Sequence, residues 1–103
     1  MTEGGLYTVR WAPDRDPWTN EEPVSLDTQI VRGDAPESGA ILDLVPWMST
    51  MGHGIDGAVE ITELEPGTYR SSWTFTMPGP WDVRIDIDGS GGSDHLVLTT
   101  HVQ

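Results

Sequence analysis

The chain contains no cysteine. Disulfide bonds, cysteine nucleophiles and zinc–thiolate sites are therefore excluded, although the redox compartment stays open because many exported proteins also lack cysteine. No run of about 20 apolar residues is present, so we expect no direct membrane insertion by this segment. Basic residues are scarce, five against 17 acidic ones, which gives a formal net charge of −12. Such a charge repels phosphate backbones and anionic lipids, which argues against binding of nucleic acid or of membrane surfaces.

The composition that remains is that of one folded domain. A length of 103 residues suits a single compact unit, residues 1–103, that can bury a core without disulfides or metals. The apolar fraction is modest at 36%, but five tryptophans supply large apolar surfaces. We therefore expect an ordered chain.

The sequence contains short runs in which apolar and polar residues alternate, and clusters of turn-forming residues separate these runs. No stretch shows sustained helical periodicity. The clearest run is 81–88, in which apolar residues beginning at Trp81 alternate with charged ones. Pro46 is expected to end the strand before it, and residues 89–94 to form a flexible hairpin loop. We expect strands at residues 6–11, 24–32, 40–45, 58–64, 69–76, 81–88 and 95–102.

Seven strands at this spacing predict an all-β fold, an antiparallel β-sandwich of immunoglobulin-like or cupredoxin-like type. Loops gather at the two ends of such a sandwich. The loop at 47–57 and the corner at Met77 could therefore lie at the same end. Six residues are expected in the core: Trp73, Phe75, Trp81, Val83, Ile85 and Leu98.

Residues 47–54 place two thioethers and an imidazole close together. Thioether sulfur is a soft ligand and imidazole a borderline one, so a Met/His set without carboxylates favours Cu(I) over zinc, calcium or magnesium. A second interpretation stands beside this one, because methionine often fills irregular gaps in a core and a histidine between glycines is often an ordinary loop residue.

The same two interpretations apply to each candidate residue. Met77 shares strand parity with Trp73 and Phe75, so it could simply be the last core residue of its strand. Met48 could also be a core residue, because it directly follows a proline and a tryptophan. His53 is the strongest candidate, since apolar packing gives no reason for a histidine at that position.

Other polar features have weaker functional signals. His95 and His101 share parity on the last strand and are expected to face solvent, with a weak Cu(II) or zinc site as the less favoured alternative. Residues 86–94 resemble a calcium loop but lack the EF-hand spacing and its closing glutamate. No nucleophile elbow, phosphate-binding loop or histidine-rich catalytic set is present, so we expect a protein that is not an enzyme.

Four segments of the sequence form an ordered set of motifs: residues 5–9, 46–54, 66–69 and 75–81. Together they resemble the YtkA-like/FixH-like domains of exported bacterial proteins. That family is characterised by a Met-Pro-x-Met/His-Gly-His type segment, followed by Gly-x-Tyr and then by Met-x-Gly-x-Trp. Ser49 departs from the pattern, because many members have proline after the first methionine.

The resemblance implies an extracytoplasmic, for example periplasmic, β-sandwich cut from a longer precursor with a signal or anchor. Residues 1–5 themselves show no signal segment, which leaves open a cytoplasmic protein or a mature exported domain. The family is associated with copper handling or with assembly of a copper-containing respiratory oxidase. The implied partners are a copper ion and a membrane oxidase or copper-transport protein.

Ligand chemistry and resemblance together suggest a copper site, with Trp47 or Trp81 covering the ion. The expected function is that of an extracytoplasmic Cu(I) carrier or chaperone. The alternative is a non-catalytic immunoglobulin-like interaction module that assists assembly of a membrane respiratory complex. The expected ligands are Met48, Met51, His53 and Met77.

Overall fold

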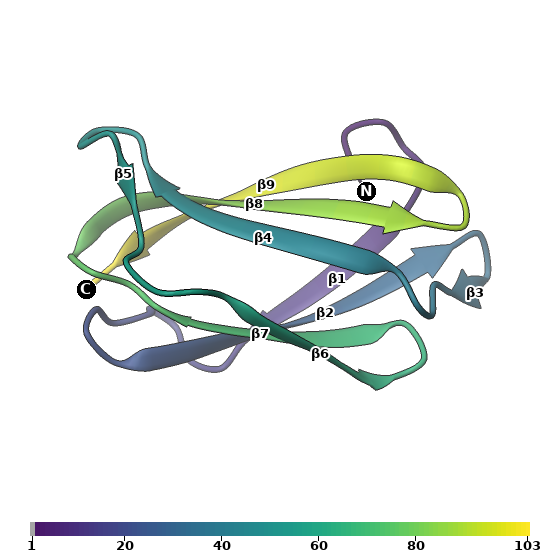
Figure 1. Cartoon of the computed structure of the whole chain (residues 1–103), viewed down its shortest axis with the longest axis horizontal. Coiled ribbons are helices and arrows are strands. Elements are labelled where there is room, and N and C mark those ends of the chain that lie inside the picture. The colour runs from purple at the N-terminus through teal and green to yellow at the C-terminus, as the bar shows by residue number, and fades with distance from the viewer. Residues whose placement is uncertain (1) are drawn as a thin grey trace.

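A computed structural model describes residues 2–103, which form two antiparallel sheets and contain no helix. Accordingly, no helix in that range could cross a membrane. The two sheets form the two layers visible in Figure 1. The first sheet has the order β1-β2-β7-β6 with β3 beside β2, and the second has the order β5-β4-β8-β9. The all-β antiparallel sandwich predicted from the sequence is confirmed.

The longer strands lie where the sequence predicts them, and several extend beyond the predicted bounds. The first sheet contains β1 (Thr8–Pro13), β2 (Pro23–Arg32), β3 (Ala35–Pro36), β6 (Glu60–Glu65) and β7 (Thr68–Thr74). The second contains β4 (Ile41–Met48), β5 (His53–Gly54), β8 (Gly79–Gly89) and β9 (Gly92–Val102). Within the described residues, seven strands have six residues or more, and β3 and β5 have two each.

The core lies between the two sheets, where alternate residues of β7 and β8 meet. Along β8 every second side chain from Trp81 to Ile87 is buried, as the alternation predicts. Five of the six expected core residues are buried, whereas Leu98, on the edge strand β9, is only half-buried. Trp11, on the edge strand β1, shares a face with Tyr7 and Val9 but is 50% exposed.

β4 continues through Pro46, which corrects the prediction that this proline ends the strand. Pro46 is directly opposite Val83 on β8. A proline can occupy an outer strand where its missing N–H would point away from the neighbouring strand. Trp47 and Met48 therefore belong to β4, and β5 begins at His53, so the expected loop at 47–57 is partly strand.

The β8–β9 connection is a tight hairpin, which corrects the prediction of a flexible loop at 89–94. Gly89 pairs with Gly92, so the turn contains two residues. The Ser90 hydroxyl donates to the buried carboxylate of Glu37, at 2.8 Å from Oε1. Sequence pattern alone could not reveal this anchor, because Glu37 lies 53 residues away in the chain.

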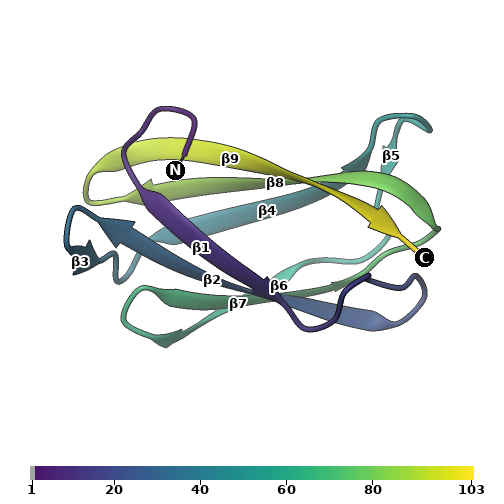
Figure 2. The same ribbon diagram turned by 180° about the vertical axis from the view of Figure 1, so that it is seen from behind.

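One end of the sandwich is rich in aromatic side chains. Phe75 lies between Trp73 and Trp81, with ring centroids 5.5 and 5.0 Å away, and Trp18 packs against Trp73 at 5.3 Å. The molecule measures 37 by 24 by 21 Å. Seen from behind, the C-terminus lies at the end of the long axis that also carries β5 (Figure 2). This aromatic cluster supports the end of the sandwich where the candidate site is found.

Candidate metal site

The β4–β5 hairpin presents His53 and Met48 as a cross-strand pair. Its turn is closed by the amides of Met51 and Gly52, which both donate to the Met48 carbonyl, at 3.2 and 2.8 Å. Gly52 has a φ of 67°, a conformation that glycine adopts readily. Directly opposed residues of an antiparallel pair lie on the same face, so His53 is on the inward face that Met48 occupies.

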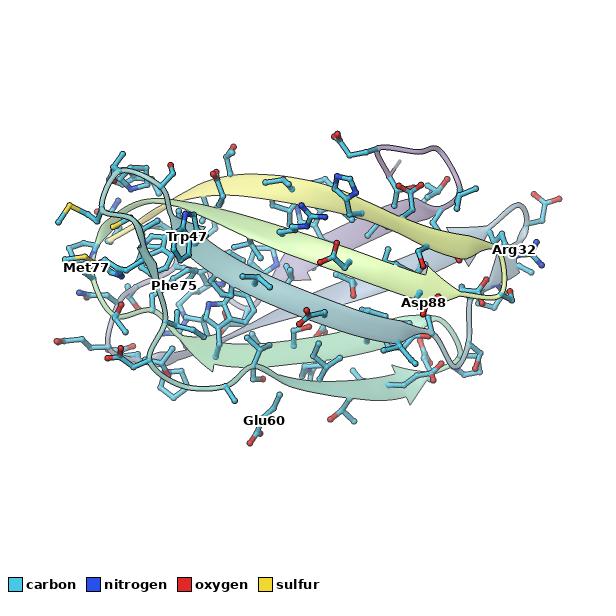
Figure 3. The ribbon with its side chains drawn as sticks, turned by 45° about the horizontal axis from the view of Figure 1, so that its top comes forward. Arg32, Trp47, Glu60, Phe75, Met77 and Asp88 are labelled. Carbon is cyan, nitrogen blue, oxygen red and sulfur yellow. The ribbon has the colours of Figure 1, made fainter. Side chains whose placement is uncertain are left out.

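Met77 lies in the connection between β7 and β8, which links the two sheets, and its side chain reaches the hairpin. Its sulfur is 3.0 Å from Nε2 of His53, although the two residues are 24 positions apart. The Trp81 indole N–H donates to the Met77 carbonyl at 3.0 Å, which holds the connection against the core. Figure 3 shows Met77 at the same end as Trp47 and Phe75, opposite the end of Arg32 and Asp88. The structure therefore brings two of the four expected ligands into direct contact.

The hydrogen bond made by Nδ1 of His53 determines whether Nε2 is available to bind a ligand. Nδ1 lies 3.0 Å from the Gly54 carbonyl oxygen. A carbonyl can only accept, so we infer that Nδ1 carries a proton and donates to it. In a neutral imidazole this leaves Nε2 as a bare lone pair facing the Met77 sulfur, which is also an acceptor. A proton or a soft cation placed at this contact would satisfy both atoms.

Trp81 forms one wall of the contact. Its ring plane is nearly perpendicular to that of His53, with centroids 5.9 Å apart and an interplanar angle of 83°, and the side chain is 1% exposed. Trp47 is 44% exposed and pairs with Gly54, so it lies on the opposite face of the hairpin from His53. Of the two tryptophans expected to cover the site, Trp81 is the one beside the His53 ring.

The remaining two methionines differ sharply in exposure. Met48 is 2% exposed, and a Cβ built on Gly79 would lie 2.9 Å from its methyl carbon. Met48 therefore packs as a core residue against the connection that carries Met77. Met51 is 61% exposed at the hairpin tip. Neither has a sulfur contact with His53 comparable to that of Met77.

Gly79 is a residue of the site that sequence reasoning missed. Its φ of 125° and its contact with the Met48 methyl leave little space for a side chain. The proline on each side of it was a visible turn signal, but the contact with a residue 31 positions earlier was not. The role of the Gly54 carbonyl could not be predicted either, because every residue has a backbone carbonyl and the sequence gives no signal for it.

The other two histidines lie on β9, and His101 is near the same end of the sandwich but exposed. His95 is half-buried opposite Asp86, and His101 is exposed opposite Pro80. Across residues 2–103, no group of three or more His, Asp or Glu side chains is placed to hold a metal ion. That finding does not concern thioether ligands, which belong to methionine.

The fold and this end together define a two-sheet β-sandwich domain in which an imidazole on β5 meets a thioether from the connection between the two sheets. The chain belongs to the YtkA-like family, whose model matches residues 6–86. The matched part includes Trp47, Met48, Met51, His53, Met77 and Trp81, and ends before His95 and His101.

A solved structure with a similar fold is that of a DUF4426 family protein from Pseudomonas aeruginosa PAO1. The two share 11% identity with a TM-score of 0.69, over 95% of this chain and 91% of that one. At this identity the likeness concerns the fold alone. A search of curated proteins found no match.

Proposed function

We propose that this domain binds Cu(I) as cargo, as a carrier or chaperone in the periplasm or another extracytoplasmic compartment. The observation that carries the proposal is the 3.0 Å contact between His53 Nε2 and Met77 Sδ. The bond from Nδ1 to the Gly54 carbonyl fixes which nitrogen is free. A soft thioether beside an unprotonated imidazole nitrogen is a ligand pair suited to Cu(I).

The pair fits a metal ion after a small movement. Bonds from a metal to imidazole nitrogen and to sulfur are about 2.0 and 2.3 Å. The two ligand atoms must therefore separate somewhat from their present distance of 3.0 Å. Met77 can supply this movement, because it is half-buried and its unbranched side chain has three rotatable bonds.

The four expected ligands have different roles in this proposal. His53 and Met77 form the fixed pair, and Met51 is the third ligand, free to swing from the exposed tip of the hairpin. An exposed, mobile ligand suits a carrier, which has to release its ion to a partner. Met48 supports the pair from the core and joins the site only if its packing against Gly79 loosens. Trp81 excludes water from one side and offers a cation–π contact.

The matched experiment measures Cu(I) affinity by competition with a chromophoric chelator under reducing conditions. We expect His53→Ala and Met77→Leu each to weaken binding by about tenfold or more, as is typical when metal-site residues are removed. His101→Ala should leave the affinity unchanged, because His101 is exposed on β9. Affinity should also fall in acid, because a proton on Nε2 occupies the position of the ion.

Two results would contradict the proposal. One is wild-type affinity in both site variants, with folding verified by circular dichroism. The other is a loss of affinity that follows His95 and His101 instead. Indifference to the metal, together with capture of a membrane respiratory complex, would favour the interaction module over the carrier. The full reading frame would test the compartment by showing a signal peptide or a membrane anchor.

A further inference from the structure

β4 has one open edge. It pairs with β8 from Ile41 to Trp47, whereas β5 covers only Trp47 and Met48 on its other side. After Gly54 the chain departs toward β6 in the other sheet. Residues 41–46 therefore present an edge of about 20 Å, at about 3.4 Å per residue, that no strand within residues 2–103 pairs with.

Pro46 shows which backbone groups point out of this edge. It has no N–H and pairs with Val83, so its nitrogen faces away from β8. Backbone groups on a strand alternate in direction, so those of Leu42 and Leu44 face the same way as those of Pro46. The edge therefore offers the N–H donors and carbonyl acceptors of Leu42 and Leu44 in the spacing that another strand requires, whereas the Pro46 carbonyl lies against Gly54.

A groove lies directly beside this edge, and apolar side chains supply part of its lining. It has a volume of about 580 Å³ and is lined by β4 and by residues of the segment that leads into β6. Ile55, Val59 and Ile61 supply apolar surface opposite Leu42 and Leu44. An added strand would place every second side chain in this groove and the others on the outer face of the sheet.

Two other outer strands, β6 and β9, carry features that oppose such pairing. β6 contains three glutamates and an irregular register near Glu63. β9 is covered near both ends, because the Glu3 amide donates to the His95 carbonyl and the Gln103 amide donates to the Trp18 carbonyl. Natural sheets use charge, irregularity and coverage in this way to prevent edge pairing. At β4, by contrast, such protection is limited to Asp43 and Pro46.

Charge specifies the partner further. The chain has no lysine and five arginines. In the part of the chain that the structure describes, four of the arginines form ion pairs: Arg15, Arg32, Arg70 and Arg84. Asp43 is exposed on β4, and no basic residue lines the groove. A segment with basic outward side chains complements this surface, whereas a second copy would bring another charge of −12.

We propose that the open edge of β4 binds an extended segment of a partner protein in which apolar and basic residues alternate. The segment adds a strand beside β4, in line with β5, and so extends the second sheet. Its apolar side chains enter the groove, and its basic ones lie on the outer face near Asp43. The site is separate from the His53–Met77 pair and does not depend on copper.

Amide hydrogen exchange at Leu42 and Leu44 tests this proposal directly. The probe is a blocked nine-residue peptide that alternates valine and lysine, added at low ionic strength. In the free protein these two amides should exchange quickly, while those of Asp43 and Val45, bonded to β8, are protected. The peptide should slow exchange at Leu42 and Leu44 by about tenfold or more. A valine–glutamate peptide should have no effect.

Three controls separate strand addition from general attraction to an acidic protein. A peptide of the same composition with its lysines in one block should fail, and so should one N-methylated at alternate amides. Leu42→Pro should abolish the effect, and Leu42→Ala, which keeps the N–H, should retain most of it. The proposal is overturned if the blocked-lysine peptide protects equally, if protection maps to β9, or if Leu42 and Leu44 are already protected in a self-associated form.

Discussion

At the scale of single residues, the site depends on how one imidazole is oriented. The Gly54 carbonyl accepts a hydrogen bond from Nδ1 of His53, and Trp81 restricts the ring from one side while its indole N–H donates to the Met77 carbonyl. A histidine between two glycines was visible in the sequence as an unusual candidate. Its contact with Met77 was not, because that contact depends on how the two sheets pack.

Trp81 is expected to be important for stability, because it is 1% exposed and contacts Phe75 as well as His53. Trp81→Ala should lower the free energy of unfolding by about 3 to 5 kcal/mol, the range for removal of a large buried aromatic side chain. Urea unfolding of this variant beside Trp47→Ala measures the effect. The Trp47 variant should lose far less, since that ring is 44% exposed. Equal losses would mean that burial does not explain the role of Trp81.

Asp94 ties the N-terminal segment to β9. Its pKa is well below the usual range, first because the Thr2 hydroxyl donates to it and further because the amides of Leu6, Gly4 and His95 do so. A carboxylate with a depressed pKa stabilises the fold at neutral pH, and this contribution is lost as the pH falls through and below the ordinary aspartate range.

Asp94→Asn should therefore destabilise the protein at pH 7, and the difference between the two proteins should shrink progressively as the pH falls from about 4 to about 2. Thermal midpoints of both proteins across this pH range provide the measurement. A difference between the two proteins that stays constant with pH would contradict the assignment.

At the scale of elements, much of the strand pattern could be predicted because β8 and β7 alternate cleanly between buried and exposed positions. The errors fall where pairing decides the outcome. Pro46 continues β4 because its nitrogen faces the open edge, and residues 89–94 are mostly strand because Glu37 anchors the turn. Neither the edge position of Pro46 nor the distant Glu37 contact can be read from local sequence.

The β6–β7 turn offers a test of backbone conformation against packing. Gly67 has a φ of 83°, and a Cβ there would lie 2.6 Å from Cβ of Pro36. Gly33 also has a positive φ, of 62°, but open space around it. Gly33→Ala should cost about 1 kcal/mol from conformation alone, and Gly67→Ala clearly more. Gly57→Ala, with open space around it and a negative φ, should be neutral or slightly stabilising.

Chemical denaturation of the three glycine variants provides the comparison. The ranking Gly67, Gly33, Gly57, from largest loss to smallest, is the expected result. Equal losses at Gly67 and Gly33 would show that the contact with β3 has no energetic role.

At the scale of the whole molecule, the net charge of −12 is the dominant electrostatic feature. Repulsion among acidic residues opposes the compact state, and salt screens it, with a Debye length that falls from about 30 Å at 0.01 M to about 3 Å at 1 M. The exposed ion pairs, such as Arg70 with Asp27, contribute little in return. The thermal midpoint should therefore rise as sodium chloride is added over this range. A midpoint that falls would mean that ion pairs outweigh the repulsion.

The most direct test of the central claim is an Ag(I) titration, with silver in place of Cu(I), followed by NMR of methionine methyl groups and histidine ring nitrogens. With one equivalent of Ag(I), the Met77 methyl signal and Nε2 of His53 should shift together, with Met51 moving in the same step. The signals of His95 and His101 should stay in place, and Met77→Leu should reduce the His53 response. If the His53 and Met77 signals remain unchanged in excess Ag(I), or if the shifts appear at His95 and His101, the contact between His53 and Met77 is not a metal site.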